Sequence, residues 1–336
     1  MLRLTRQLAA YIAMLMCCVA FGIASADTVT LRPLTRGDRP YSVEGTITDY
    51  RGDKVTIKSG RGVTKTYPAG RVLEIDTTWP AEYVAAQQAI EEKAWQTAAK
   101  QLTNVIRSEQ RAWARRWLVA DLLRCRLALG QWEQAGELLI ALDTSDPTTR
   151  AWSLAPLPWF AADDITPSDA RAWLDRPEES ARLLGAAWLL TTPEQRLARG
   201  ELRSLARSKR PAIASLAECQ LWRLDLVQAD ARQTDRWEDR LQAIPAHLQA
   251  GPQHLLAHVY LRQKRYDDAA LIALQAPLTG VAPHRLSARG LLLAAKALSA
   301  ASHDEEAQVL LEEITTEYAD TPQRQDAAAL LARIEN

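Results

Sequence analysis

From Ala81 to the C-terminus, apolar residues recur every three or four positions and are interrupted at short intervals by proline or glycine. This spacing gives each segment one apolar face at the helical period. Alanine, leucine, glutamine, glutamate and arginine dominate the region, and all are good helix formers. Thr166-Pro167 and Thr192-Pro193 have the form of helix starts, because proline is tolerated in a first turn. The pattern predicts a mainly all-α fold of antiparallel helix hairpins.

Four segments of this region share one register, with a turn followed by a short run that ends in alanine: Lys93 to Ala98, Gly130 to Ala135, Lys264 to Ala269, and Ser302 to Ala307. In the second segment, Trp132 follows the turn glycine and Pro147 ends the second helix. This arrangement resembles the tetratricopeptide repeat (TPR), in which a small alanine lies where the two helices cross closest. The closing segment Glu317 to Pro322 is similar to the turn between repeats in exported bacterial repeat proteins. The resemblance implies an α-solenoid, in which each helix pair covers its neighbour's apolar face.

The match is confined to the two ends of the helical region. We expect TPR-like helix hairpins over 79–150 and again over 250–336. Residues 151–249 do not match and read as irregular, HEAT-like hairpins, with one pair predicted at 178–190 and 194–207.

A different period precedes the helices. Between Tyr41 and Ile75, β-branched residues alternate with polar ones, and glycine-containing turns separate the runs. This pattern predicts four short strands in an antiparallel meander. We expect a small β domain over 27–78, curled into an SH3-like or Sm-like half-barrel.

The first 26 residues have the features of a secretory signal peptide. Arg3 and Arg6 precede an apolar stretch, and Ala24-Ser25-Ala26 supplies the small residues of a cleavage site. We therefore expect export to the periplasm or the cell surface, with no membrane span after cleavage; the alternative is a signal segment retained as an anchor. Without those two arginines, acidic residues slightly outnumber basic ones, which does not favour a nucleic-acid partner.

The TPR resemblance also places a concave groove along the first helix of each pair. Its lining would be Tyr83, Gln87, Ile90, Glu91, Trp117, Ala120, Arg124, Leu127, His254, His258, Leu261, Arg262, Arg289, Leu292, Lys296 and Ser299. This set contains four arginines or lysines and a single acid. We expect it to bind an acidic or carboxylate-ended peptide through bidentate arginines. The alternative is that these charges are solvated helix faces.

No motif in the sequence indicates catalysis, a metal or a cofactor. His254 and His258 are four residues apart on one predicted helix, but leucine occupies the position of a zincin's glutamate. Cys125 and Cys219 are expected to be buried thiols. Among the tryptophans of the irregular middle, one or two of Trp152, Trp159 and Trp173 are candidates to line a ligand groove. The predicted function is a non-catalytic extracytoplasmic scaffold; the alternatives are a hydrolase or metal-dependent enzyme with its site in the middle region, and a structural component of envelope assembly.

Overall fold

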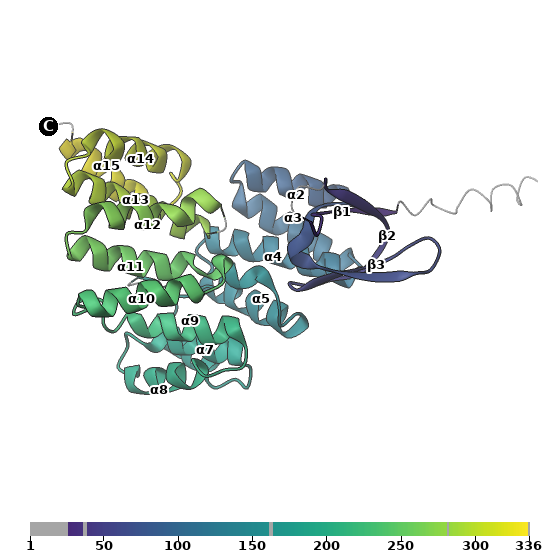
Figure 1. The fold of residues 1–336 in the computed structure, drawn as a ribbon, viewed down its shortest axis with the longest axis horizontal. Coiled ribbons are helices and arrows are strands. Elements are labelled where there is room, and N and C mark those ends of the chain that lie inside the picture. Colours follow the sequence, from purple (N-terminus) through teal and green to yellow (C-terminus); the bar gives the residue numbers. More distant parts are fainter. Residues whose placement is uncertain (1–25, 36–38, 161–163, 281, 335–336) are drawn as a thin grey trace, which may run out of the picture. The chain divides into compact units, whose positions relative to one another are not determined.

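The computed structural model describes residues 26–35, 39–160, 164–280 and 282–334. The chain divides into two compact units, Met1–Pro80 and Ala81–Asn336. The first unit carries a small antiparallel sheet and the second is helical (Figure 1), which confirms the predicted mainly helical fold preceded by a β module. The predicted signal peptide lies outside the described residues except for its last position, Ala26.

The sheet has five strands where the sequence predicted four. They are β1 Asp27–Leu31, β2 Tyr41–Tyr50, β3 Lys54–Lys58, β4 Thr64–Pro68 and β5 Val72–Asp76. Across the sheet, the hydrogen-bonded strands lie in the order β4-β3-β2-β1-β5. A short 3₁₀ helix, η1 (Ala69–Arg71), precedes β5. The four predicted strands are β2, β3, β4 and β5, although β5 pairs with β1 and not with β4 as a simple meander would require. The prediction missed β1, which pairs with both β2 and β5, because five residues next to the cleavage site give a weak alternation signal.

Asp27 fixes one end of the sheet. Its carboxylate accepts a 2.7 Å hydrogen bond from the backbone N–H of Ile47 and a 2.5 Å bond from the Thr77 hydroxyl. Opposite Asp27 in the register lies Gly45, where an added Cβ would approach the Lys58 carbonyl oxygen to 2.5 Å. Glycine is therefore required there for β2 and β3 to come this close.

The helices of the second unit follow one another as antiparallel neighbours in three runs, α2 to α5, α6 to α9 and α10 to α15. Their bounds are α2 Ala81–Glu91, α3 Trp95–Ser108, α4 Ala112–Ala128, α5 Trp132–Ser145, η2 Arg150–Leu154, α6 Pro167–Leu174, α7 Glu179–Leu189, α8 Gln195–Leu205, α9 Pro211–Trp222, α10 Ala231–Ala243, η3 Ala246–Leu248, α11 Ala250–Arg262, α12 Tyr266–Thr279, α13 His284–Ala300, α14 Asp304–Glu317 and α15 Gln323–Ile334. No helix among the described residues is both long and apolar enough to cross a membrane.

The four turns that the sequence placed in one register share one backbone conformation. Lys93, Gly130, Lys264 and Ser302 each have a positive φ, between 58° and 72°. Glycine occupies only one of these positions, and the other three residues adopt the left-handed conformation without it. The alanine five residues after each turn residue is fully buried, in Ala98, Ala135, Ala269 and Ala307. Small side chains at these points let the paired helices approach each other closely.

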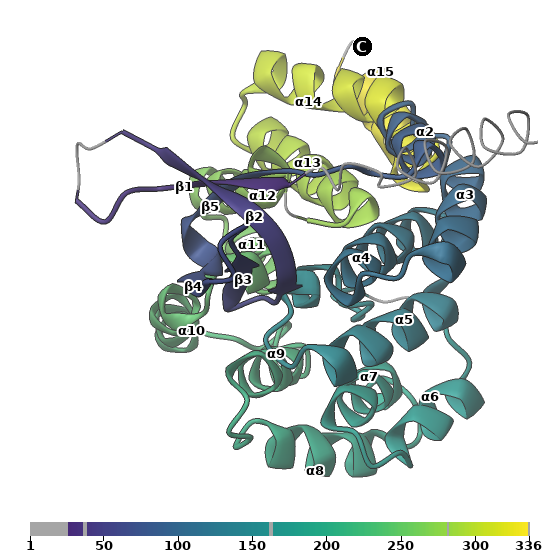
Figure 2. The same cartoon turned by 90° about the vertical axis from the view of Figure 1, so that its right-hand side faces the viewer.

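The first and last hairpins of the helical unit touch. Lys93 forms an ion pair with Glu317, and the Trp95 indole N–H donates to Asp320 over 2.9 Å. Asp320 also pairs with His284 over 2.8 Å. Elsewhere in the same unit α4 contacts α13, and Figure 2 shows these two helices next to each other. The array of helices therefore closes on itself instead of ending in two separate tips.

Candidate binding site

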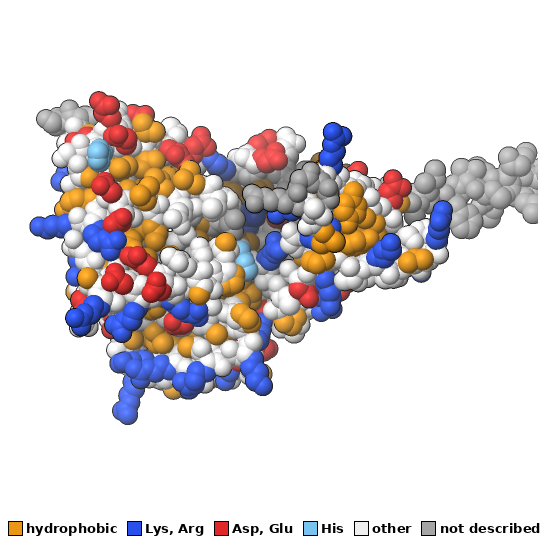
Figure 3. Space-filling view, in the orientation of Figure 1, with side chains coloured by type: hydrophobic (Ala, Val, Ile, Leu, Met, Phe, Trp, Pro, Cys, Tyr) orange, Lys and Arg blue, Asp and Glu red, His pale blue; other side chains and the backbone are white. Residues whose placement is uncertain are grey.

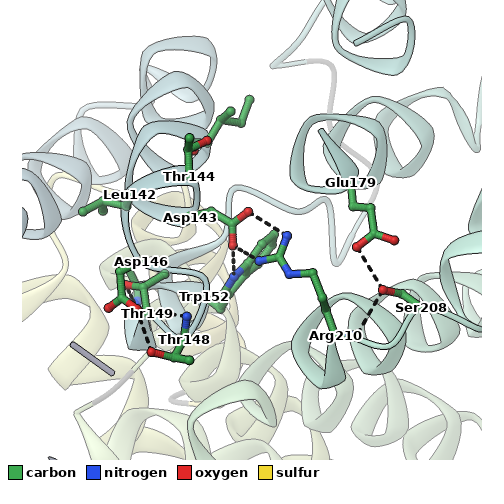
Figure 4. A network of polar contacts seen from close by, with 12 residues as sticks. Leu142, Asp143, Thr144, Asp146, Thr148, Thr149, Trp152, Glu179, Ser208 and Arg210 are labelled. Carbon is green, nitrogen blue, oxygen red and sulfur yellow. Dashed lines mark hydrogen bonds and ion pairs between the residues drawn. The ribbon is translucent and has the colours of Figure 1, made fainter. Parts of the chain in front are cut away.

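A segment between α5 and α6 interrupts the helical array and forms one wall of the candidate site. It comprises η2 and the extended residues Ala155 to Phe160. Its start is held by a buried ion pair between Asp143 at the end of α5 and Arg210 at the start of α9, to which the Trp152 indole N–H adds a 3.0 Å hydrogen bond (Figure 4). Because Asp143 is almost completely buried, its charge is stable only with these partners.

Residues 155 to 160 then pass between α7 and α11. The Trp188 indole of α7 donates to the Pro156 carbonyl over 2.9 Å, and Leu157 is fully buried. The Trp159 ring lies against Gly251 of α11, where an added Cβ would come within 1.9 Å of the indole. Gly251 thus admits a ring that any side chain would exclude. All three tryptophans predicted to be candidates are buried; Trp152 and Trp159 line a small cavity, and Trp159 also forms part of the wall of a second hollow.

The Phe160 ring contacts two of the predicted groove residues, Arg289 and His254. The guanidinium carbon of Arg289 on α13 lies 3.2 Å from the centre of the Phe160 ring, a cation–π contact. His254 of α11 meets the same ring edge-on, with 6.3 Å between ring centres. The segment therefore supplies an aromatic side chain between α11 and α13.

Beside Phe160 opens a hollow of about 350 Å³, which we call the Phe160 hollow. Its apolar wall is formed by Trp159, Phe160, Leu226 and Val227, and its polar wall by His258 and Arg262. The guanidinium of Arg262 also donates a hydrogen bond to the Ala229 carbonyl, which holds this group against the loop before α10. The lining among the described residues is thus apolar on one side and cationic on the other.

Two histidines at this site are kept uncharged. Their Nε2 atoms are 3.2 Å apart, so one ring donates to the other. Burial lowers the pKa of His254, and the positive fields of His258 and Arg289 add to this effect. Burial also lowers the pKa of His258, with Lys296 and Arg289 contributing. Nδ1 of His254 has no hydrogen-bond partner within the described part of the chain.

The positive charge at this site is only partly compensated. Burial lowers the pKa of Arg289 to about 10; Arg285 acts in the same direction, and Asp164 and Asp326 oppose it. Within the described ranges, Arg262, Arg289 and Lys296 form no ion pair with a carboxylate. This combination of cations and apolar surface can bind an anionic group attached to an apolar one.

The predicted groove residues of the N-terminal hairpins form a separate cluster around Asp121 on α4. Its carboxylate accepts hydrogen bonds from the Tyr83 hydroxyl over 2.9 Å and from the Gln87 amide over 2.7 Å. Arg124 approaches it to 4.0 Å, and Trp117 on the same helix remains exposed. Burial raises the pKa of Asp121, while Arg124, Tyr83 and Gln87 oppose this. The cluster is a buried junction between α2 and α4.

The structure therefore does not place all the predicted groove residues in one hollow. Of the predicted groove residues, only His258 and Arg262 are among the described residues that line the Phe160 hollow. His254 and Arg289 pack on the Phe160 ring, and the charge of Lys296 helps to lower the pKa of His258. No local sequence pattern indicated that Phe160, Leu226 and Val227 would contribute to the site. The proline- and aromatic-rich composition of 156–160 was the one available cue.

Comparisons with known proteins add no relative: no family model matches the chain, and neither a curated protein nor a solved structure is significantly similar to it. In the described ranges, no three His, Cys, Asp or Glu residues gather as a metal site would require. Both Cys125 and Cys219 are buried free thiols, as predicted.

Proposed function

We propose that the protein is a non-catalytic binding protein that takes the carboxylate-bearing end of a peptide or protein partner in the Phe160 hollow. The supporting observation is the pairing of an apolar wall with Arg262 in the lining, with Arg289 on the Phe160 ring and Lys296 near His258; none of the three cations forms an ion pair with a carboxylate among the described residues. A terminal carboxylate would face the cations, and an apolar final side chain would contact Phe160 and Val227. The proposal includes export by the predicted N-terminal signal, so that binding would take place outside the cytoplasm.

The hollow favours a chain end over an internal acidic segment. One wall is mostly apolar and carries no charged side chain, so a matching ligand presents an uncharged group and an anionic group close together. Arginine recognises a carboxylate by two parallel N–H···O bonds, which a terminal carboxylate is free to accept. The neutral His258 adds a ring nitrogen that donates or accepts according to its tautomer.

The test compares two fluorescein-labelled peptides of one sequence, ending in Asp-Glu-Leu, with a free carboxylate in one and an amide in the other. Fluorescence anisotropy should show binding of the first and at least about tenfold weaker binding of the second, because a charge-assisted hydrogen bond contributes about 1.5–3 kcal/mol. Lys296→Glu and Arg262→Glu should each weaken binding of the free carboxylate.

The matched control is Arg199→Glu, the same kind of charge reversal at an exposed position on α8. It should leave peptide affinity unchanged. Equal affinity for the amide and the carboxylate, or equal losses in Arg199→Glu and Lys296→Glu, would reject the Phe160 hollow as the carboxylate site.

A further inference from the structure

A second cationic surface lies on α8, formed by residues that do not line the Phe160 hollow. Arg196, Arg199 and Arg203 lie along α8, and Arg207 and Lys209 follow in the next turn. All five are exposed, and within the described ranges none forms an ion pair. We call them the cationic ridge. Figure 3 shows lysine and arginine side chains gathered along the edge of the molecule where Figure 1 labels α8.

The ridge is produced by the geometry of the helix. Ala198, Leu202 and Leu205 are buried and fix the inner face of α8. At 100° per residue, Arg196 and Arg203 fall on the opposite face, with Arg199 close beside them. The nearby acids are already engaged, because Glu194 pairs with Arg171 and Glu201 lies 3.5 Å from Arg182. The positive charge of the ridge is therefore only partly compensated, in a chain with no net charge.

A hollow of about 400 Å³ adjoins the ridge. Arg199 and Arg203 form one side, Leu221 and Leu224 line it, and Asp225 is its one acid among the described residues. Arg223, between those leucines in the sequence, does not line the hollow; its guanidinium donates to the Ala187 carbonyl of α7 and to the Gln220 side chain. Burial lowers the pKa of Arg223 to about 10. The hollow thus combines guanidinium donors with apolar side chains.

We propose that the cationic ridge and this hollow bind the phosphate headgroups of an anionic lipid surface. Exposed arginines in a row neutralise several headgroups at once, and their attraction is confined to a short distance from the membrane. Leu197 flanks the ridge with 46% of its surface exposed, which supplies an apolar contact beside the charges. Single-stranded nucleic acid is disfavoured because residues 194–210 contain no aromatic side chain on which a base could stack.

The experiment measures sedimentation of the mature protein with vesicles of phosphatidylglycerol and phosphatidylcholine, and with vesicles of phosphatidylcholine alone. We expect binding to the anionic vesicles only, weakening as salt is raised. The triple variant Arg196→Glu/Arg199→Glu/Arg203→Glu should lose at least about tenfold in vesicle affinity. The charge-matched control is Lys100→Glu/Arg324→Glu/Arg333→Glu, all exposed and without ion pairs in the described ranges, and it should retain most of the binding.

Three outcomes would overturn the proposal: equal binding to neutral vesicles, equal losses in the two triple variants, or tighter ridge-dependent binding of a short DNA oligonucleotide than of anionic vesicles. Should the glutamate variant fold poorly by circular dichroism, the corresponding arginine-to-glutamine triple variant removes the charge with less repulsion and must show the same loss. Peptide binding in the Phe160 hollow is measured separately, and the ridge variants should leave it unchanged.

Discussion

His254 shows how the environment of one residue sets its chemistry. Its ring is buried against Phe160, and burial, followed by His258 and Arg289, lowers its pKa. In the unfolded chain a histidine titrates near pH 6.5. Below that pH the unfolded state binds a proton that the folded state resists, so the free energy of unfolding falls as the pH falls through 6.5.

We therefore predict that His254→Gln reduces the acid sensitivity of the protein. Between about pH 7.5 and about pH 5, the wild type should lose up to about 2 kcal/mol more unfolding free energy than the variant, because one pKa unit corresponds to about 1.4 kcal/mol. Urea unfolding at the two pH values measures the difference. Equal losses in both proteins would show that His254 titrates normally in the folded state.

At this scale the sequence predicted which residues share a helix but not what they meet. The spacing of His254 and His258 placed both rings on one face of a helix, and the structure has their Nε2 atoms 3.2 Å apart. Phe160 lies about 90 residues earlier in the sequence and reaches them through an extended segment without a period. Contacts of that kind depend on the path of the chain, so a local pattern does not reveal them.

Among the elements, the helices were more predictable than the strands. The helix predicted at 178–190 is α7 (Glu179–Leu189), and that at 194–207 is α8 (Gln195–Leu205). Both carry a long apolar period and clear starts. Strand β1 has only two buried apolar side chains, Val29 and Leu31, and owes its place in the sheet to pairing with β2 and β5. Its stability is non-local, which is why the sequence pattern missed it.

Two glycines in neighbouring helices give opposite predictions for the same substitution. A Cβ on Gly185 of α7 would come within 2.4 Å of the Ala170 carbonyl oxygen and 2.5 Å of the Leu174 nitrogen, both in the backbone of α6. Gly185→Ala should therefore destabilise the protein by about 1–3 kcal/mol. Gly200 of α8 has open space around it. Gly200→Ala should stabilise it by about 0.5–1 kcal/mol, because alanine loses less backbone entropy in a helix.

Thermal unfolding of both variants beside the wild type measures these changes. An unchanged stability of Gly185→Ala would contradict the close approach of the α6 backbone to Gly185 of α7. A destabilising Gly200→Ala would likewise contradict the solvent-exposed position of that residue.

For the molecule as a whole, the helical unit depends on contacts between residues far apart in sequence. Asp320 accepts hydrogen bonds from Trp95 and His284 and so links the first hairpin to the last. The TPR resemblance predicted the hairpins and their turns, but an open solenoid has no such contacts. Closure depends on the summed rotation of all helix pairs, including the irregular ones, and no single repeat specifies it.

We predict that Asp320→Ala weakens the contact between the first and last hairpins. Removing the shared acceptor should cost about 1–2 kcal/mol, because the Trp95 and His284 donors lose their partner. Hydrogen exchange followed by mass spectrometry should show faster exchange in α3 and α15 and unchanged exchange in α7 and α8. Asp267→Ala, at a more exposed position, is the control. Unchanged exchange in α3 would mean that this contact does not hold the ends together.

The contact between the first and last hairpins also limits the ways in which this chain can gain or lose a helix pair. An open array of repeats can gain or lose a unit at either end, since each unit contacts only its neighbours. Here the duplication or deletion of one helix pair would move Lys93 and Trp95 away from Glu317 and Asp320. The number of helix pairs is thus fixed by geometry, and a designer who wishes to lengthen this protein must do so in its loops.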